Sequence, residues 1–195
     1  METVIDPAVV KRFEAVSALP PLLPEDQRRN HSITDVRPGG CITVGATPYR
    51  VLERYWYTED SYVWYEVQLY NLATGEITYL EWEIDDELEV FIESERLSNL
   101  ADANLTPSKL TEMDDEETGT VTYNGNTYSY DDSGIATFYR KEGDPGQEVK
   151  YWDLVGPSGM LMGVEKWDDG YTISISIPVN PLSIQVLLVG GTNAN

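Results

Sequence analysis

The chain has 195 residues, 41% of them apolar, and a formal net charge of −21. This apolar content supports a packed core and excludes wholesale disorder. A chain so negative repels phosphate backbones and anionic bilayers, so we expect no nucleic-acid binding and no membrane insertion. The partners that suit its charge are cations, such as a basic protein, a polyamine-like molecule or a divalent metal.

The single cysteine and the composition of the first residues both bear on the location of the protein. Cys41 is the only cysteine, so the chain can form neither an intrachain disulfide nor a paired-cysteine metal site. The first sixteen residues carry early acids and no long apolar run, unlike a signal peptide. We therefore expect a cytoplasmic protein, and no sequence motif implies a cofactor.

Residues 1–38 are expected to form a helix and a connector. Asp6 is a typical N-cap and Pro7 a typical first helical residue. Apolar residues then recur at helical spacing as far as Val16. Residues 20–38, with their prolines and polar side chains, predict an irregular connector.

Residues 39–94 are expected to form a first β block. Tyrosine, tryptophan, valine and isoleucine dominate it, as in half-buried strands. Residues 95–119 interrupt the strands and are predicted to be a linker, in which Thr106 and Pro107 begin a single helical turn. The strands that we expect in the first block are 41–44, 47–57, 62–71, 76–84 and 88–94.

Residues 120–190 are expected to form a second β block. It opens with a hairpin around Asn124 and Gly125, a pair that accepts the positive φ angles of a tight turn. Five apolar runs separated by turn residues follow. Residues 191–195 are predicted to be a frayed tail.

The two β blocks resemble each other. The spacing from Gly75 to Glu81 equals that from Gly159 to Glu165, and Trp82 and Trp167 follow. We interpret this as a tandem duplication. Neither copy alone buries its apolar face, so the predicted fold is all-β: tandem-repeat antiparallel sheets forming a sandwich or a barrel-like unit, with an N-terminal α-helix.

Longer stretches carry a family resemblance. "VTYNGNTYSYDDSGIATFYRKEG", "YWDLVGPSGMLMGVEKWDD" and "ISIPVNPLSIQVL" resemble the bacterial domain of unknown function family 4178, and the first block resembles the family's first half. The resemblance covers about residues 40–188. It implies no catalytic residues. Members are often encoded near membrane-stress and polyamine-synthesis proteins, which implies a link to a stress response. Some members carry a zinc ribbon that this chain lacks.

Acidic residues concentrate in strands and turns. The stretch "YLEWEIDDELEVFIE", residues 79–93, has many acids and no basic residue. The first expectation is a hairpin with a solvated face, because strand residues alternate between two faces. The second is a recognition surface for a basic partner. The acids lack the spacing of an EF-hand loop, so no metal site is predicted.

Tryptophans in the predicted strands are expected mainly to pack in the core. The alternative is a groove in which rings and carboxylates meet, which suits an amine through cation–π contacts and ion pairing. The candidate binding residues for such a groove are Glu81, Trp82, Asp85, Asp86, Glu165, Trp167, Asp168 and Asp169.

Catalysis is the weaker expectation. His31 is the only histidine and lies in the connector, and Cys41 is expected to be buried rather than nucleophilic. We therefore predict a non-enzymatic interaction module that recognises a basic protein or a polyamine-like cation. The alternatives are a structural assembly subunit, favoured if Val9, Val10 and Phe13 are exposed, an acid-dependent hydrolase, or a DNA mimic. The oligomeric state is not predicted.

Overall fold

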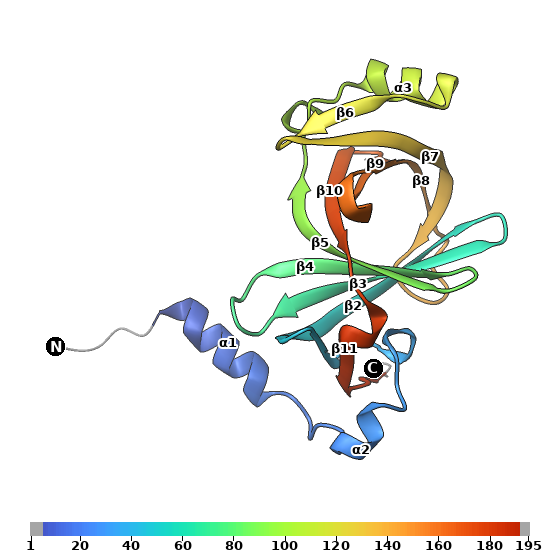
Figure 1. Ribbon diagram of the computed structural model, residues 1–195. Helices are drawn as coiled ribbons and strands as arrows, with labels where there is room; N and C mark the ends of the chain where they lie inside the picture. The colour runs from blue at the N-terminus through green and yellow to red at the C-terminus, as the bar shows by residue number, and fades with distance from the viewer. Residues whose placement is uncertain (1–5, 192–195) are drawn as a thin grey trace. The chain divides into compact units, whose positions relative to one another are not determined.

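The computed structural model describes residues 6–191, which form mainly antiparallel β-strands (Figure 1). The predicted all-β class, its barrel-like arrangement and its N-terminal helix are confirmed. The strands follow the order β11-β1-β2-β3-β4-β5-β10-β9-β8-β7-β6. The chain divides into two compact units: unit 2 comprises Tyr55–Tyr65 and Glu81–Pro178, and unit 1 comprises the rest.

Unit 1 contains the N-terminal segment and five strands or parts of strands. Its strands are β1 (Cys41–Val44), the first part of β2 (Thr47–Glu59), the last part of β3 (Tyr62–Asn71), the first part of β4 (Ile77–Ile84) and β11 (Ile184–Leu188). The 3-10 turn η4 (Pro181–Ser183) leads into β11. The fully buried side chains of this unit are Ile33, Val36, Cys41, Ile42, Val51, Val67, Leu69, Leu80 and Val186.

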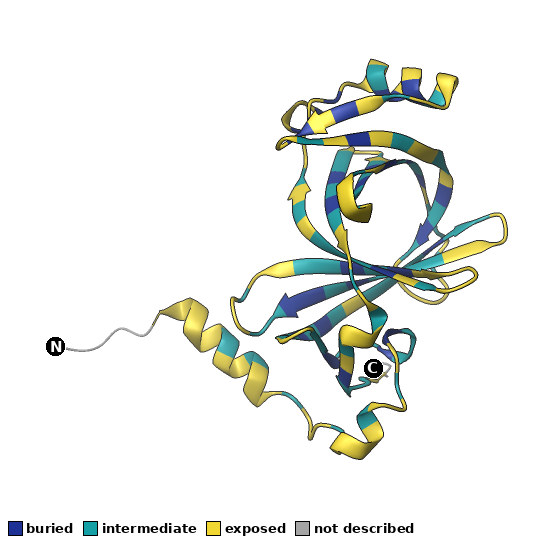
Figure 2. Ribbon diagram, viewed as in Figure 1, coloured by how far each residue is buried: buried dark blue, intermediate teal, exposed yellow. Residues whose placement is uncertain are grey.

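The predicted N-terminal helix is confirmed as α1 (Pro7–Ser17), and the side chain of Asp6 caps it by accepting a hydrogen bond from Ala8 N at 2.9 Å. No α1 residue is buried (Figure 2). Arg12 attaches the helix by donating to the Ala73 carbonyl at 2.5 Å. The connector is less irregular than predicted, since it contains α2 (Glu25–Arg28) and η1 (Ile33–Asp35).

Unit 2 holds the remaining parts of β2, β3 and β4 together with six further strands. These are β5 (Leu88–Leu97), β6 (Thr120–Tyr123), β7 (Asn126–Tyr139), β8 (Gln147–Val155), β9 (Leu161–Trp167) and β10 (Gly170–Pro178), with the turn η3 (Pro157–Gly159) between β8 and β9. An additional pairing of β2 with β7 closes β2-β3-β4-β5-β10-β9-β8-β7 into a ring. The closing ladder is short and pairs Trp56 with Tyr139, Tyr57 with Phe138 and Thr58 with Thr137.

The strands of unit 2 bury two separate sets of side chains because alternate residues point to opposite faces. One set, on what we call the α3 face, includes Trp152, Leu154, Met162, Val164, Ile173 and Ile175. The other, on what we call the Tyr57 face, includes Tyr57, Ala136, Phe138 and Val149.

The hairpin predicted at residues 124–125 is present between β6 and β7. Asn124 has φ of 47° and Gly125 has φ of 79°, so both central residues are left-handed, as a two-residue turn with the twist of the strands requires.

The linker is more ordered than its sequence predicts. β5 continues to Leu97, η2 (Leu100–Ala103) follows, and the expected single turn is a ten-residue helix, α3 (Pro107–Glu116). Thr106 caps α3 by accepting from Lys109 N at 3.1 Å. The helix is longer than predicted because the burial of Leu110 and Met113 on the α3 face stabilises further turns.

The two sequence blocks mix in the sheet. β11 of the second block pairs with β1 of the first, and β10 of the second pairs with β5 of the first. The tandem duplication itself stays a prediction. The predicted fraying concerns residues 191–195, of which 192–195 lie outside the described residues. None of the helices described between residues 6 and 191 has the length and apolarity needed to cross a membrane.

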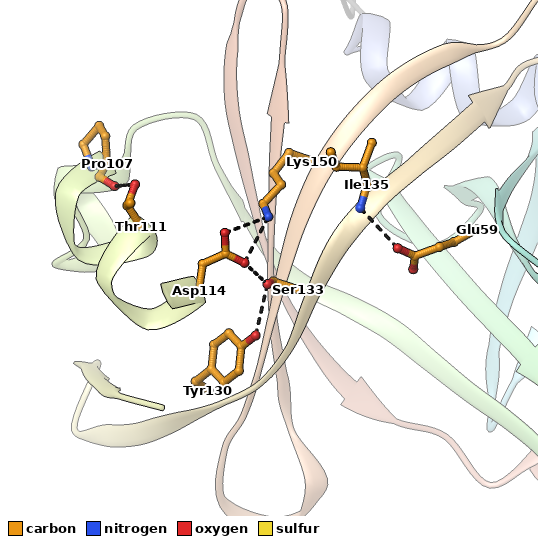
Figure 3. A network of polar contacts seen from close by, with 8 residues as sticks. All are labelled: Glu59, Pro107, Thr111, Asp114, Tyr130, Ser133, Ile135 and Lys150. Atoms are coloured by element: carbon orange, nitrogen blue, oxygen red, sulfur yellow. Dashed lines mark hydrogen bonds and ion pairs between the residues drawn. The ribbon is translucent and has the colours of Figure 1, made fainter. Parts of the chain in front are cut away.

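A polar network joins α3 to the sheet (Figure 3). Lys150 on β8 donates to both carboxylate oxygens of Asp114, at 2.8 and 3.0 Å. Ser133 on β7 also donates to Asp114, and its hydroxyl lies 3.0 Å from that of Tyr130. The hydrogen bonds from Lys150 and then Ser133 hold the pKa of Asp114 below its usual value of 3.8. The network therefore fixes α3 over its buried residues.

Replacing Asp114 with asparagine is expected to lower the free energy of unfolding by about 1 kcal/mol at pH 7, because the ion pair with Lys150 is lost. The folded-state pKa of Asp114 is depressed, so this contribution is present above the usual pKa and disappears as the pH falls through the folded-state value. Urea denaturation at pH 7 and about pH 3 measures both effects. Asp115→Asn, at the adjacent exposed position, is the control, and an equal loss there would contradict the assignment.

Candidate functional site

Nearly all of the negative charge belongs to unit 2. Its segments contain 25 acidic and six basic residues, a formal charge of −19, whereas unit 1 has a formal charge of −2. A site that uses this charge is therefore expected in unit 2.

Five aromatic rings form a continuous chain on the Tyr57 face. Trp167 meets Phe138 edge-on, with centroids 5.1 Å apart, and Phe138 contacts Tyr57 at 5.0 Å. Tyr57 stacks on Trp64 at 5.2 Å, and Trp64 meets Tyr151 at 5.8 Å. The rings come from β2, β3, β7, β8 and β9, so the closed ring of strands is what brings them together.

Carboxylates contact both ends of this chain of rings. At one end, Trp167 Nε1 donates to Glu165 at 3.2 Å. At the other, the Tyr151 hydroxyl donates to Glu59 at 2.5 Å and lies 3.4 Å from an Asp132 oxygen. Glu59 also accepts from Ile135 N at 3.2 Å (Figure 3). With Asp153, described next, we call these residues the acid–aromatic cluster: Tyr57, Glu59, Trp64, Asp132, Phe138, Tyr151, Asp153, Glu165 and Trp167.

Asp153 lies directly across from another acid. The β7–β8 register pairs Asp132 with Asp153, and residues that face each other in an antiparallel ladder have Cβ atoms about 5 Å apart. Like charges at such positions repel each other. The same row continues through Gly163 on β9 and Ser174 on β10 to Arg96 on β5.

The environment of Asp153 favours its neutral form. Burial raises its pKa from the usual 3.8 to about 7, and the repulsion of nearby carboxylates adds to the rise; these belong to Asp132, Glu165, Asp131 and Glu83. No hydrogen bond reaches the Asp153 carboxylate from the residues between 6 and 191. Asp153 nevertheless keeps a solvent-accessible edge. It is a half-buried acid whose charge the described residues do not neutralise.

Two neighbours of Asp153 also have raised pKa values. Burial raises the pKa of Glu165, against the opposing effects of hydrogen bonds with Tyr57 and Trp167 and of the charge of Arg96. Burial, followed by the hydrogen bond to Glu59, raises the pKa of the Tyr151 hydroxyl, which therefore stays protonated at neutral pH. The cluster thus offers acceptors on its carboxylates and an uncharged phenol beside them.

The eight residues predicted from the sequence lie in several places. Glu165 and Trp167 belong to the acid–aromatic cluster and contact each other. Trp82 is 1% exposed and stacks on Tyr65 at 5.5 Å, so it packs in the core, and Glu81 is half-buried beside it in β4. Asp168 and Asp169 are exposed in the turn between β9 and β10.

The remaining two, Asp85 and Asp86, are exposed in the turn between β4 and β5. They line an open hollow of about 260 Å³ whose other lining residues are Glu83, Glu87 and Glu89. Burial, and then repulsion from Glu89 and Asp85, raises the pKa of Glu83. This hollow contains acids without rings, so it lacks the aromatic component that the predicted groove requires.

Sequence reasoning missed Glu59, Asp132, Asp153 and Tyr151. Glu59 and Asp132 adjoin turn residues, where an acid ordinarily indicates only solvated surface. A usable signal was present, because a lone glycine inside a strand indicates close approach of another group. Gly134 is such a glycine: a Cβ there would collide with Glu59 and with the Tyr151 ring.

The other chemical candidates have structural roles. Cys41 is buried in β1, and burial raises the pKa of its thiol. His31 Nδ1 lies 3.7 Å from Asp35, which caps η1 together with Ser32. Within residues 6–191, no group of three or more histidine, cysteine or acidic side chains has an arrangement that could hold a metal ion.

Replacing Asp153 with asparagine is expected to stabilise the protein at pH 8. Because the folded-state pKa is raised, the folded state binds more protons than the unfolded state between about pH 4 and pH 7, and the wild type loses stability as the pH rises through this range. The variant escapes this loss, so its gain should be roughly 1–3 kcal/mol at pH 8 and small at pH 4. Urea denaturation at the two pH values measures the difference.

The control for this experiment is Asp168→Asn, which removes the same charge from an exposed turn. A gain equal to that of the Asp153 variant would indicate general relief of self-repulsion and would contradict a special environment at Asp153.

Comparison with known proteins gives the family of the chain. No curated protein and no solved structure matches it. A family model described as "Domain of unknown function (DUF4178)" matches residues 37–181. This match covers more than half of the chain and agrees with the resemblance in the sequence, and the chain therefore belongs to the domain of unknown function family 4178.

Proposed function

We propose that the protein is a non-enzymatic binding module that recognises a cation, either a polyamine-like molecule or a basic side chain of another protein, through unit 2. The observation that carries this proposal is the acid–aromatic cluster, in which four carboxylates contact or neighbour a continuous chain of five rings. Carboxylates supply ion pairs for a cation, and aromatic faces attract it through the ring quadrupole.

The formal charge of unit 2 supports this proposal in a second way. A charge of −19 on one unit raises the local concentration of cations and speeds their encounter with the protein. The rings then select among the cations, because aromatic faces attract the ammonium and guanidinium groups of amines and basic side chains. We also infer a cytoplasmic location from the single cysteine, and a role in a stress response stays an expectation from the family resemblance.

An acid-dependent hydrolase is the less supported reading of the same cluster. Such an enzyme needs two carboxylates whose pKa values are pushed apart, one acid and one base. The environments of Asp153 and Glu165 instead raise both values. Two acids whose pKa values are both raised suit the exchange of protons for a cation better than they suit acid–base catalysis.

A structural assembly subunit is the second candidate, and the surface of α1 favours it. Val9, Val10 and Val16 are more than two-fifths exposed, and Phe13 is 72% exposed. Arg12 and Ala15, on another side of α1, are partly covered. An exposed apolar stripe on a helix is typical of a surface that packs against another chain.

Spermidine is expected to raise the melting temperature of the wild-type protein beyond the effect of NaCl, MgCl2 or CaCl2 at matched ionic strength. A ligand that binds only the folded state, at about 100 times its dissociation constant, adds roughly 2.7 kcal/mol of stability. Differential scanning fluorimetry measures the shifts. Equal shifts for all of the cations would mean only relief of self-repulsion and would contradict recognition by the cluster.

If α1 joins two copies of the chain, the wild type should associate as its concentration rises, and Phe13→Glu should abolish this association, because a charge cannot be buried unpaired in an apolar contact. Sedimentation equilibrium measures both. Leu182→Glu, at an exposed residue far from α1 in sequence, is the matched control. A wild type that stays monomeric throughout would exclude self-assembly through α1.

A further inference from the structure

The strand order ends at β6, and among residues 6–191 no strand lies on the side of β6 away from β7. The two strands join through a two-residue turn, and Tyr123 is the residue of β6 that closes it. Such a closing residue bonds to the facing strand, and so does every second residue before it. Gly119 fits this alternation, since its carbonyl accepts from Tyr130 N at 2.9 Å. The backbone groups of Thr120 and Thr122 therefore point away from β7.

Little of the chain covers this outer side of β6. The helix α3 packs on the face of the sheet, where Leu110 and Met113 are buried. The side chain of Asn104 donates to the Thr122 carbonyl at 2.8 Å. Within the described part of the chain, no hydrogen bond uses the N–H of Thr122 or the N–H and carbonyl of Thr120, and both residues are exposed. We call this side of the strand, with its three free backbone groups, the β6 edge.

The sequence around the β6 edge lacks the usual protection against strand pairing. Proteins commonly guard an exposed edge with a charged side chain, a proline or a covering segment. Residues 118–130 contain no charged residue and no proline, although charged residues make up 24% of the chain. At the other end of the strand order, the proline-rich connector is bonded to β11, where Leu23 N donates to the Leu187 carbonyl at 2.8 Å. The β6 edge is therefore the less protected of the two.

Acidic side chains lie at both ends of the β6 edge. The acids at residues 115–117 are half-buried or exposed and precede the uncharged stretch directly. Asp102 is exposed in η2, near the other end. The hydrogen bond to Glu95 and then burial raise the pKa of the Tyr123 hydroxyl, and the charge of Asp102 adds to the rise. A strand that pairs with this edge thus meets a neutral centre between two acidic ends.

We propose that the β6 edge binds an extended, basic segment of another protein, which joins the sheet as a further strand beside β6. The backbone of the segment pairs with the free groups of Thr120 and Thr122, and lysine or arginine side chains near its ends reach the flanking acids. This inference goes beyond the proposed function, because the β6 edge shares no residue with the acid–aromatic cluster. It commits to a protein partner, since a polyamine has no peptide groups that could pair with a strand.

The charge of unit 2 favours a basic partner over a second copy of the chain. A second copy would bring another formal charge of −19 to the contact, and like charges oppose association. A basic segment is attracted by the same charge. In strand addition the main-chain hydrogen bonds supply affinity and alternate side chains supply specificity. Thr120 and Thr122 share one face of β6, so they favour β-branched residues opposite them.

Fluorescence polarisation of a labelled probe peptide tests this inference with the full chain. The probe has two lysines at each end and five alternating threonine and valine residues between them. Its control carries the same charges but is N-methylated at the five central residues, so that these cannot donate backbone hydrogen bonds. At matched ionic strength we expect the probe to bind roughly tenfold or more tightly than the control.

Amide hydrogen exchange of the wild type locates the contact without any substitution. The amides of Thr120 and Thr122 are expected to exchange quickly in the free protein, because they have no acceptor, and to become protected when the probe is bound. The amide of Val121, which faces β7, is expected to be protected in both states. Unchanged exchange of the two threonine amides at saturating probe would overturn the inference.

Two substitutions at one position separate the backbone from the side chain. Thr122→Pro removes the outward N–H and leaves the bonds of Val121 and Tyr123 to β7 in place, since an edge strand accepts proline where its N–H faces solvent. It should weaken probe binding roughly threefold to tenfold. Thr122→Val keeps the N–H and a β-branched side chain, so it should bind the probe as the wild type does. Circular dichroism checks that both variants are folded.

The outcomes separate this inference from the proposed function. If the probe and its N-methylated control bind equally, the chain recognises charge alone, so the β6 edge is excluded and a cation-binding module stands. If neither peptide binds but spermidine stabilises the protein, only the inference fails. If neither the peptides nor spermidine act beyond matched NaCl, both fail. Association of the wild type with itself that Thr122→Pro abolishes would assign the edge to a second copy and contradict the inference.

Discussion

Unit 2 depends on the short ladder between β2 and β7, whose three residue pairs close the strands from β2 to β7 into a ring. Tyr57 lies in this ladder opposite Phe138, so the backbone pairing and the ring contact at 5.0 Å reinforce each other. The same closure brings Glu59 to the Tyr151 hydroxyl, although 92 residues separate them in the sequence. Loop-closure entropy opposes so distant a pairing, and the burial of the rings offsets it.

The ring of strands also concentrates carboxylates, which opposes folding. Asp132 and Asp153 face each other across the β7–β8 ladder, and the formal charge of the unit is −19. The α3 face provides the compensation. It buries a large apolar set beneath α3, and the bonds of Lys150 to Asp114 fix the helix there. The well-packed α3 face therefore offsets the cost of the Tyr57 face, whose side chains are not optimised for stability. Such a division is common where a fold carries a binding site.

The sequence predicts most of the elements because their signals are local. Asp6 and Pro7 begin α1, and Asn124 with Gly125 forms the hairpin turn. Glu165 and Trp167 are candidates in the sequence because their spacing from Gly159 resembles that of Glu81 and Trp82 from Gly75, and in β9 they share a face since one position separates them. Asp153 was missed because its significance depends on Asp132, Gly163 and Ser174, each from another strand. Register between distant strands is a property of the whole sheet, and no local pattern encodes it.

The two strand glycines of the Tyr57 face make room for groups that the chain itself supplies. Glu59 and Tyr151 occupy the space above Gly134, and the Ser174 hydroxyl occupies the space above Gly163, where a Cβ would lie 2.9 Å from its oxygen. Glycine weakens a strand, and a half-buried acid that faces other carboxylates lowers stability further, so both features oppose folding in the row that contains Asp153 and Gly163. The cost of concentrating carboxylates on this face is what the proposed binding of a cation would offset.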